Sequence, residues 1–127
     1  MDVKARKYAA VLVVEDEPLI RMDAVDMIED AGFRTYEAGS ADEAIVLMEH
    51  HEDIGVLFTD IDMPGTMDGL KLAEFVRGKW PSVAILITSG AIDISEESLP
   101  VGTVFLPKPY SMALIIEKLD SIAVQLG

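Results

Sequence analysis

Polar residues that could do chemistry stand directly behind short apolar runs in this sequence. Carboxylates follow the first and third runs, a threonine ends the fourth, and a lysine ends the fifth. A set of carboxylates without nitrogen or sulfur ligands favours Mg²⁺, and a hydroxyl and an ammonium group facing it would suit an incoming phosphoryl group. The residues concerned are Glu15, Asp16, Asp60, Asp62, Thr88 and Lys108.

The apolar runs alternate with longer stretches of helical spacing, which predicts repeated βα units. Most runs are apolar on both sides, as expected of parallel strands that helices cover on both faces. The predicted strands are Ala9–Val14, Phe33–Ala38, Ile54–Asp60, Val83–Thr88 and Thr103–Pro107.

Local signals mark where the helices begin and end. Pro18 favours a helix start and Gly32 a helix end. The segment between Gly90 and Gly102 is acidic, lacks an apolar stripe and contains a proline, so we expect a short or irregular fourth helix there. The other predicted helices run from Pro18 to before Gly32 and over 41–50, 68–78 and 111–124.

Five βα units in 127 residues predict an α/β, doubly wound (βα)5 fold with a five-stranded parallel sheet of flavodoxin-like order 2-1-3-4-5. A closed eight-unit barrel needs about twice this chain length. We expect residues 1–127 to form a single domain. In this order the first and third strands are neighbours at the ligand-binding switch point, which would bring Glu15, Asp16 and Asp60 together.

Composition excludes several function classes. Ten Lys and Arg against 23 Asp and Glu give a formal charge of −13, which argues against direct binding to nucleic acid or an anionic membrane. The absence of cysteine excludes thiolate nucleophiles and cysteine-based metal sites. No apolar run is long enough to span a bilayer and no signal peptide is evident, so we expect a cytoplasmic protein. Met1 and the polar start favour a complete small protein.

Four motifs follow one another along nearly the whole chain: VLVVEDEP, FTDIDMPGTMDGL, ILITSG and FLPKPY. In order and spacing they resemble the receiver domain of bacterial two-component response regulators. The resemblance implies the receiver fold, Mg²⁺ as cofactor, and a phosphoryl group donated by a sensor histidine kinase or a histidine phosphotransfer protein. It further implies a switch in the binding of a downstream protein partner, and it leaves a phosphorylation-dependent dimer open.

The resemblance also implies roles for the acidic residues. Asp60 matches the phosphoacceptor, which also binds the metal. Glu15 and Asp16 match the acidic pair that holds Mg²⁺, and Asp62 matches the position whose backbone carbonyl binds the metal. Such a protein catalyses its own phosphorylation and dephosphorylation, but it is a signalling switch rather than a turnover enzyme.

Three further residues match positions of the receiver family. Thr88 matches the switch hydroxyl that bonds the phosphoryl group, and Lys108 matches the lysine that pairs with the aspartyl phosphate. Phe105, three residues before this lysine, matches the aromatic that turns inward on activation. The resemblance therefore implies that Thr88 and Phe105 are the switch residues.

Some features depart from the commonest receiver pattern and leave other interpretations open. The loop from Pro64 to Gly69 has one residue more than most receivers, which, with the short acidic fourth-helix region, partly matches single-domain alphaproteobacterial receivers. A receiver-like docking module that acts without phosphorylation would have the same fold. The pair Asp60 and Asp62 also looks like the nucleophile and acid of haloacid-dehalogenase phosphatases, although that superfamily needs a longer chain.

Overall fold

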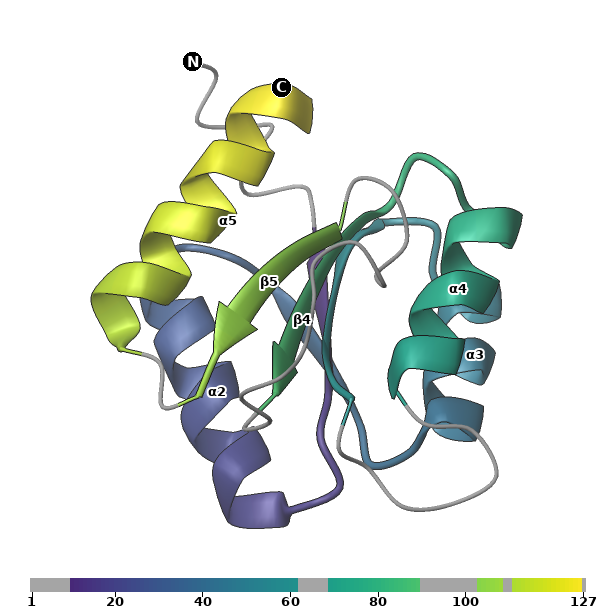
Figure 1. Ribbon diagram of the computed structural model, residues 1–127, viewed down its shortest axis with the longest axis horizontal. Helices are drawn as coiled ribbons and strands as arrows, with labels where there is room; N and C mark the ends of the chain where they lie inside the picture. Colours follow the sequence, from purple (N-terminus) through teal and green to yellow (C-terminus); the bar gives the residue numbers. More distant parts are fainter. Residues whose placement is uncertain (1–9, 62–68, 90–102, 109–110, 127) are drawn as a thin grey trace.

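The computed structural model describes residues 10–61, 69–89, 103–108 and 111–126, in which strands alternate with helices (Figure 1). The strands are β1 (Ala10–Val14), β2 (Thr35–Ala38), β3 (Ile54–Asp60), β4 (Ala84–Ser89) and β5 (Thr103–Pro107). The helices are α2 (Pro18–Asp30), α3 (Ala41–His50), α4 (Gly69–Lys79) and α5 (Met112–Leu126). This arrangement confirms the predicted α/β fold. The predicted irregular fourth helix falls in 90–102, outside the described residues.

The five strands form one parallel sheet in the order β2-β1-β3-β4-β5, which confirms the predicted order. All paired strands are parallel, so their carboxyl ends meet at one edge of the sheet. At this edge Val14 of β1 pairs with Thr59 of β3, and Asp60 of β3 pairs with Thr88 of β4. The strand ends that carry the candidate residues are therefore neighbours.

Helices cover both faces of the sheet, with α2 and α5 on one side and α3 and α4 on the other (Figure 1). Side chains of a strand point alternately to the two faces. In β1, Leu12 and Val14 accordingly pack in the cluster under α3 and α4, which we call the α3/α4 cluster. Val11 and Val13 pack in the cluster under α2 and α5, which we call the α2/α5 cluster.

Two strand boundaries differ from the prediction. The second strand begins at Thr35 rather than Phe33, because Gly32 takes a left-handed φ of 98° and the Phe33 N–H donates to the Ile28 carbonyl at 3.3 Å. Phe33 is instead buried in the α2/α5 cluster. The fourth strand is shifted by one residue and includes Ser89, which pairs with Pro107.

Two large apolar side chains of the helices are not covered by the sheet. Ile20 of α2 is 42% exposed and Phe75 of α4 is 39% exposed, whereas Val25 is buried. No helix among the described residues is long and apolar enough to cross a membrane.

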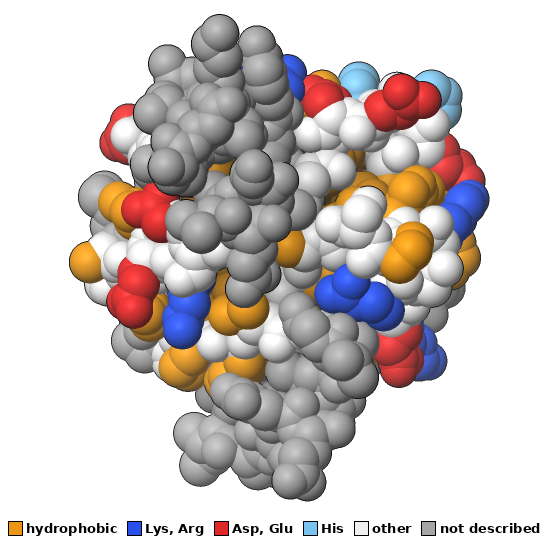
Figure 2. Space-filling view, turned by 90° about the horizontal axis from the view of Figure 1, so that it is seen from above, with side chains coloured by type: hydrophobic (Ala, Val, Ile, Leu, Met, Phe, Trp, Pro, Cys, Tyr) orange, Lys and Arg blue, Asp and Glu red, His pale blue; other side chains and the backbone are white. Residues whose placement is uncertain are grey.

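The two histidines lie at the amino edge of the sheet, away from the candidate residues. Seen from above, histidine side chains stand next to acidic ones at the rim of the molecule (Figure 2). His51 precedes β3 and stacks on Tyr36, with ring centroids 4.2 Å apart. Asp60 stands at the opposite end of this seven-residue strand, about 20 Å away. The histidines therefore lie at the end of the sheet opposite Asp60.

Candidate functional site

Four predicted site residues lie at the carboxyl edge of the sheet, on the face that α2 and α5 cover. Glu15, Asp60, Thr88 and Lys108 each stand two residues beyond a side chain of the α2/α5 cluster. Because every second residue of a strand points to the same face, the alternation that builds the core also directs these four side chains. Four chain segments thus converge on one small region.

Asp60 ends β3 as a buried carboxylate, with 4% of the residue exposed. The Lys108 Nζ forms an ion pair with Asp60 Oδ2. The lysine is held by its own backbone, since its N–H donates to the Ser89 carbonyl at 3.0 Å, beside the end of β4. The pair therefore puts an ammonium group next to a buried carboxylate, where it can stabilise added negative charge.

The Glu15 carboxyl group lies in surroundings that disfavour its charged form. Burial, and after it the neighbouring Asp60 carboxylate, raises the pKa of Glu15 from 4.5 to about 7. The Glu17 N–H donates to Glu15 Oε1 at 3.1 Å and opposes this rise. Asp16 is exposed, yet its carboxylate also raises the pKa of Glu15. Three carboxylates thus repel one another at this edge, a charge distribution that a cation would relieve.

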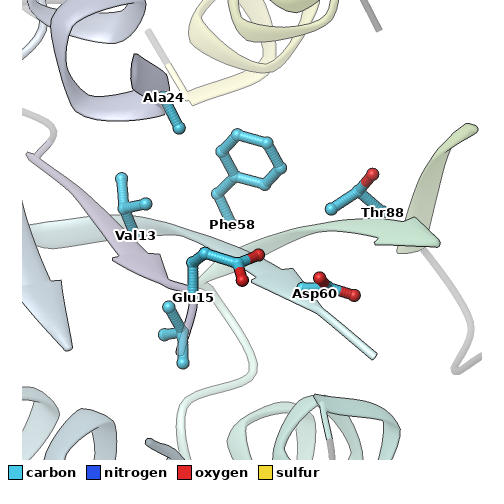
Figure 3. A pocket seen from close by; sticks show the side chains of 7 residues that line it. Val13, Glu15, Ala24, Phe58, Asp60 and Thr88 are labelled. Atoms are coloured by element: carbon cyan, nitrogen blue, oxygen red, sulfur yellow. The ribbon is translucent and has the colours of Figure 1, made fainter. Parts of the chain in front are cut away.

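A cavity of about 10 Å³, about the space of one water molecule, lies between these side chains (Figure 3). The Thr88 hydroxyl is buried and has no hydrogen-bond partner among the described residues. A buried donor without an acceptor is costly, so a ligand that accepts its hydrogen bond would be stabilised. The residues that line the cavity are Val13, Val14, Glu15, Ala24, Phe58, Asp60 and Thr88.

Gly69, the first residue of α4, packs directly against the backbone of Asp60. A Cβ atom at this position would lie 2.2 Å from the Asp60 carbonyl oxygen and 2.7 Å from the Ile61 Cα. Only glycine permits so close an approach. The start of α4 therefore helps to fix the strand end that carries the candidate nucleophile.

Comparison with known proteins agrees with this geometry. The family model described as response regulator receiver domain matches residues 11–120. The chain belongs to this family. It is a receiver domain of two-component systems, the module that has the phosphoacceptor role in them.

Two relatives illustrate the similarity. The sensor kinase CckA of Brucella abortus is 36% identical over 108 residues, which cover 82% of this chain and 11% of CckA. The transcriptional regulatory protein PdtaR of Mycobacterium tuberculosis is 31% identical over 122 residues, covering 94% of this chain and 58% of PdtaR. The receiver thus spans about a tenth of one relative and just over half of the other.

The fold of the receiver is shared with the response regulator protein TrrA of Thermotoga maritima, solved in complex with Mg²⁺-BeF. The TM-score is 0.77 at 24% identity, with 90% of this chain and 98% of TrrA covered. At this identity the similarity establishes the fold.

Receiver domains in general bind Mg²⁺, and the donor chemistry of this receiver fits such a cation. Its buried carboxylates at positions 15 and 60 are hard oxygen donors, and the pKa of Glu15 is raised first by burial and then by the neighbouring Asp60 carboxylate. Among the described residues no three His, Cys, Asp or Glu side chains form a ready metal-binding group. Asp62 lies outside the described residues, so its expected backbone contribution stays a prediction.

The expected switch pair is only partly described by the structure. Thr88 lies in the site, whereas Phe105 of β5 pairs with Ile87 and is half-buried against the α3/α4 cluster. The inward turn of Phe105 on activation stays a prediction.

Two residues that matter for the geometry escaped the sequence analysis. The first is Gly69, which the sequence analysis names only as the end of the loop from Pro64. The second is Arg21, whose side chain donates to the Glu15 carbonyl at 2.7 Å. An arginine one turn into a helix has no spacing signature that reveals such a contact.

Proposed function

We propose that Asp60 accepts a phosphoryl group from the phosphohistidine of a sensor histidine kinase or a histidine phosphotransfer protein. The observation that carries this proposal is the buried Asp60 carboxylate, ion-paired with Lys108 and adjacent to Glu15. An Asp60 oxygen attacks phosphorus, the phosphorus–nitrogen bond to histidine breaks, and the imidazole leaves with the bonding electron pair. The product is an aspartyl phosphate.

The residues around Asp60 support this transfer by orientation and charge. Lys108 supplies an ammonium group that offsets the charge of the phosphoryl oxygens, and the Thr88 hydroxyl donates to one of them. Glu15, Asp16 and Asp60, together with the backbone of Asp62, would hold Mg²⁺. When bound, the cation offsets the negative charge of the carboxylates and of the phosphoryl group.

We further propose that the phosphodonor is a protein that contacts the first turns of α2. Leu19 and Met22 are 72% and 56% exposed, and Ile20 is also exposed. They follow Glu15–Glu17 directly, so the apolar surface adjoins the edge that carries Asp60. An acidic chain with such a surface favours contact with a protein over nucleic acid.

Phosphorylation changes the affinity of the protein for a downstream protein partner. The protein's own residues catalyse both addition and hydrolysis of the phosphoryl group. This reaction takes place in the cytoplasm. The competing interpretation is a docking module that works without phosphate. An unchanged affinity for its partner with and without phosphorylation would support the docking module instead.

The test is labelling by a small phosphodonor such as acetyl phosphate with Mg²⁺, followed by intact mass. We expect the wild type to gain one phosphoryl group and Asp60→Asn to gain none. Asp23→Asn, an exposed aspartate of α2, is the matched control and should label like the wild type. Equal labelling of wild type and Asp60→Asn would contradict the assignment.

A further inference from the structure

Arg21 connects the loop after β1 to the end of β2. Its Nη1 donates to the Glu15 carbonyl at 2.7 Å, and its Nε donates to Glu37 Oε1 at 3.3 Å. The arginine side chain is 22% exposed, whereas Glu37 is 52% exposed. The guanidinium is thus half-buried, and its stronger contact is with the backbone of a predicted metal-binding residue.

Glu15 is held by three hydrogen bonds that come from three different segments. Its N–H donates to the Ala38 carbonyl at 3.1 Å, and its carboxylate accepts from the Glu17 N–H at 3.1 Å. Its carbonyl accepts from Arg21. Of these three bonds only the last is made by the side chain of another residue, so it can be removed by substitution without changing the loop itself.

The end of β2 is shaped to admit the guanidinium. A Cβ atom at Gly39 would lie 3.2 Å from Arg21 Nη1, which is closer than nine in ten real Cβ contacts. The Gly39 N–H donates to Glu43 Oε1 at 2.9 Å, in the first turn of α3. The Arg21 side chain therefore extends from α2 to the loop after β1 and the end of β2.

We propose that Arg21 is a positioning residue that sets the affinity of the site for a divalent cation. This inference rests on the proposed function. The carboxylates of Glu15, Asp16 and Asp60 repel one another, so the loop that carries two of them relaxes away from Asp60 unless its backbone is held. Holding the Glu15 carbonyl keeps the oxygen donors close together before the cation arrives, which lowers the cost of binding.

The sign of the change in Mg²⁺ affinity when Arg21 is removed distinguishes a positioning role from a direct electrostatic role. A cation such as Arg21 near the site repels Mg²⁺, so by charge alone its removal would tighten Mg²⁺ binding. Loss of positioning changes the Mg²⁺ affinity in the opposite direction. Loss of a residue that orients a metal ligand typically weakens metal affinity by 10-fold or more. Arg21→Lys keeps the charge but lacks the planar fork that reaches both Glu15 and Glu37.

The test is a Mg²⁺ titration of full-length protein without phosphodonor, followed by NMR, for wild type, Arg21→Met, Arg21→Lys and Glu37→Gln. We expect both Arg21 variants to bind Mg²⁺ about 10-fold more weakly. Glu37→Gln keeps the bond from Arg21 to the Glu15 carbonyl and should bind like the wild type. Labelling by acetyl phosphate at saturating Mg²⁺ should reach the wild-type rate in all variants, because the cation restores the loop.

Each other outcome has a distinct meaning. Wild-type or tighter Mg²⁺ binding by Arg21→Met, in a variant that circular dichroism shows to be folded, overturns the positioning role. A rate deficit that saturating Mg²⁺ does not restore also overturns it. If Arg21→Met does not fold, the result for Arg21→Lys decides. A wild type that is not labelled refutes the proposed function instead, so the two failures are distinguishable.

Discussion

Replacing Gly69 with alanine should damage the phosphorylation site through the backbone rather than through any chemical group. The added Cβ would lie 2.2 Å from the Asp60 carbonyl oxygen, and real Cβ atoms essentially never approach within 3.0 Å. The start of α4 and the end of β3 must therefore separate by at least 3.0 − 2.2 = 0.8 Å. All three nearest atoms belong to the backbone of Asp60 and Ile61, so no side chain can rotate away to make room.

The expected cost follows from this displacement. Overpacking of a well-packed region typically destabilises a protein by about 1 to 3 kcal/mol. A displacement of roughly 1 Å at a reacting group costs on the order of 100-fold in rate. We therefore expect Gly69→Ala to lose about 1 to 3 kcal/mol of stability and to be labelled by acetyl phosphate about 10- to 100-fold more slowly at saturating Mg²⁺.

Urea unfolding measures the change in the free energy of unfolding. The signal is the fluorescence of Trp80, the only tryptophan of the chain. Gly78→Ala is the matched control, because it lies in the same helix and its added Cβ meets nothing within 4 Å. This variant should gain about 0.5 to 1 kcal/mol from helix propensity and label like the wild type. Wild-type labelling and stability in Gly69→Ala would refute the reasoning.

Two further predictions concern the charge and the hydroxyl of the site. The pKa of Glu15 is about 7 in the folded protein against 4.5 ordinarily, so between these pH values the folded state holds a proton that the unfolded state lacks, and stability falls as pH rises. In metal-free urea unfolding, Glu15→Gln should remove this fall of the free energy of unfolding with pH. The variant should be about 1 to 3 kcal/mol more stable than the wild type at pH 8, but not at pH 4. An equal pH dependence in the two proteins would contradict this prediction. Thr88→Val removes a buried hydroxyl that has no hydrogen-bond partner in the part of the chain that the structure describes, so metal-free stability should stay equal or rise by about 1 kcal/mol. The gain in melting temperature with Mg²⁺ and beryllofluoride should be smaller than in the wild type, and an equal gain would show that the hydroxyl does not bond the phosphoryl mimic.

Much of the fold was predictable because hydrophobic pattern and strand order are strongly coupled. Runs such as Ile54–Asp60 are too short and too apolar for surface elements, and their alternation with helices favours a parallel sheet that helices cover on both faces. The boundary error at Phe33 has a local cause. A buried aromatic just before a strand has the same pattern as a strand residue, and only the left-handed turn at Gly32 separates the two.

The site was predictable to the extent that its residues are chemically unusual at their positions. A carboxylate at the end of a buried strand, as at Asp60, and a lysine directly after an apolar strand, as at Lys108, are costly without partners, so their presence already indicates a paired site. The strand order placed the ends of β1 and β3 side by side, whereas the pairing of Lys108 with Asp60 was implied by the resemblance to receivers, because β4 lies between β3 and β5.

The residues that position the site were not predictable for the opposite reason. Arg21 is an ordinary residue for a helix, and Gly69 is an ordinary residue for a turn, so neither type nor spacing distinguishes them. Their effects arise from the contact of Arg21 with the Glu15 carbonyl at 2.7 Å and from the close packing of Gly69 against the Asp60 backbone, which leaves no room for a Cβ atom. Such distances depend on the exact positions of α2 and α4 relative to the sheet, and the hydrophobic pattern does not determine these positions. It follows that substitutions at Arg21 and Gly69 should separate binding of the cation from placement of the nucleophile, although neither residue would touch the phosphoryl group.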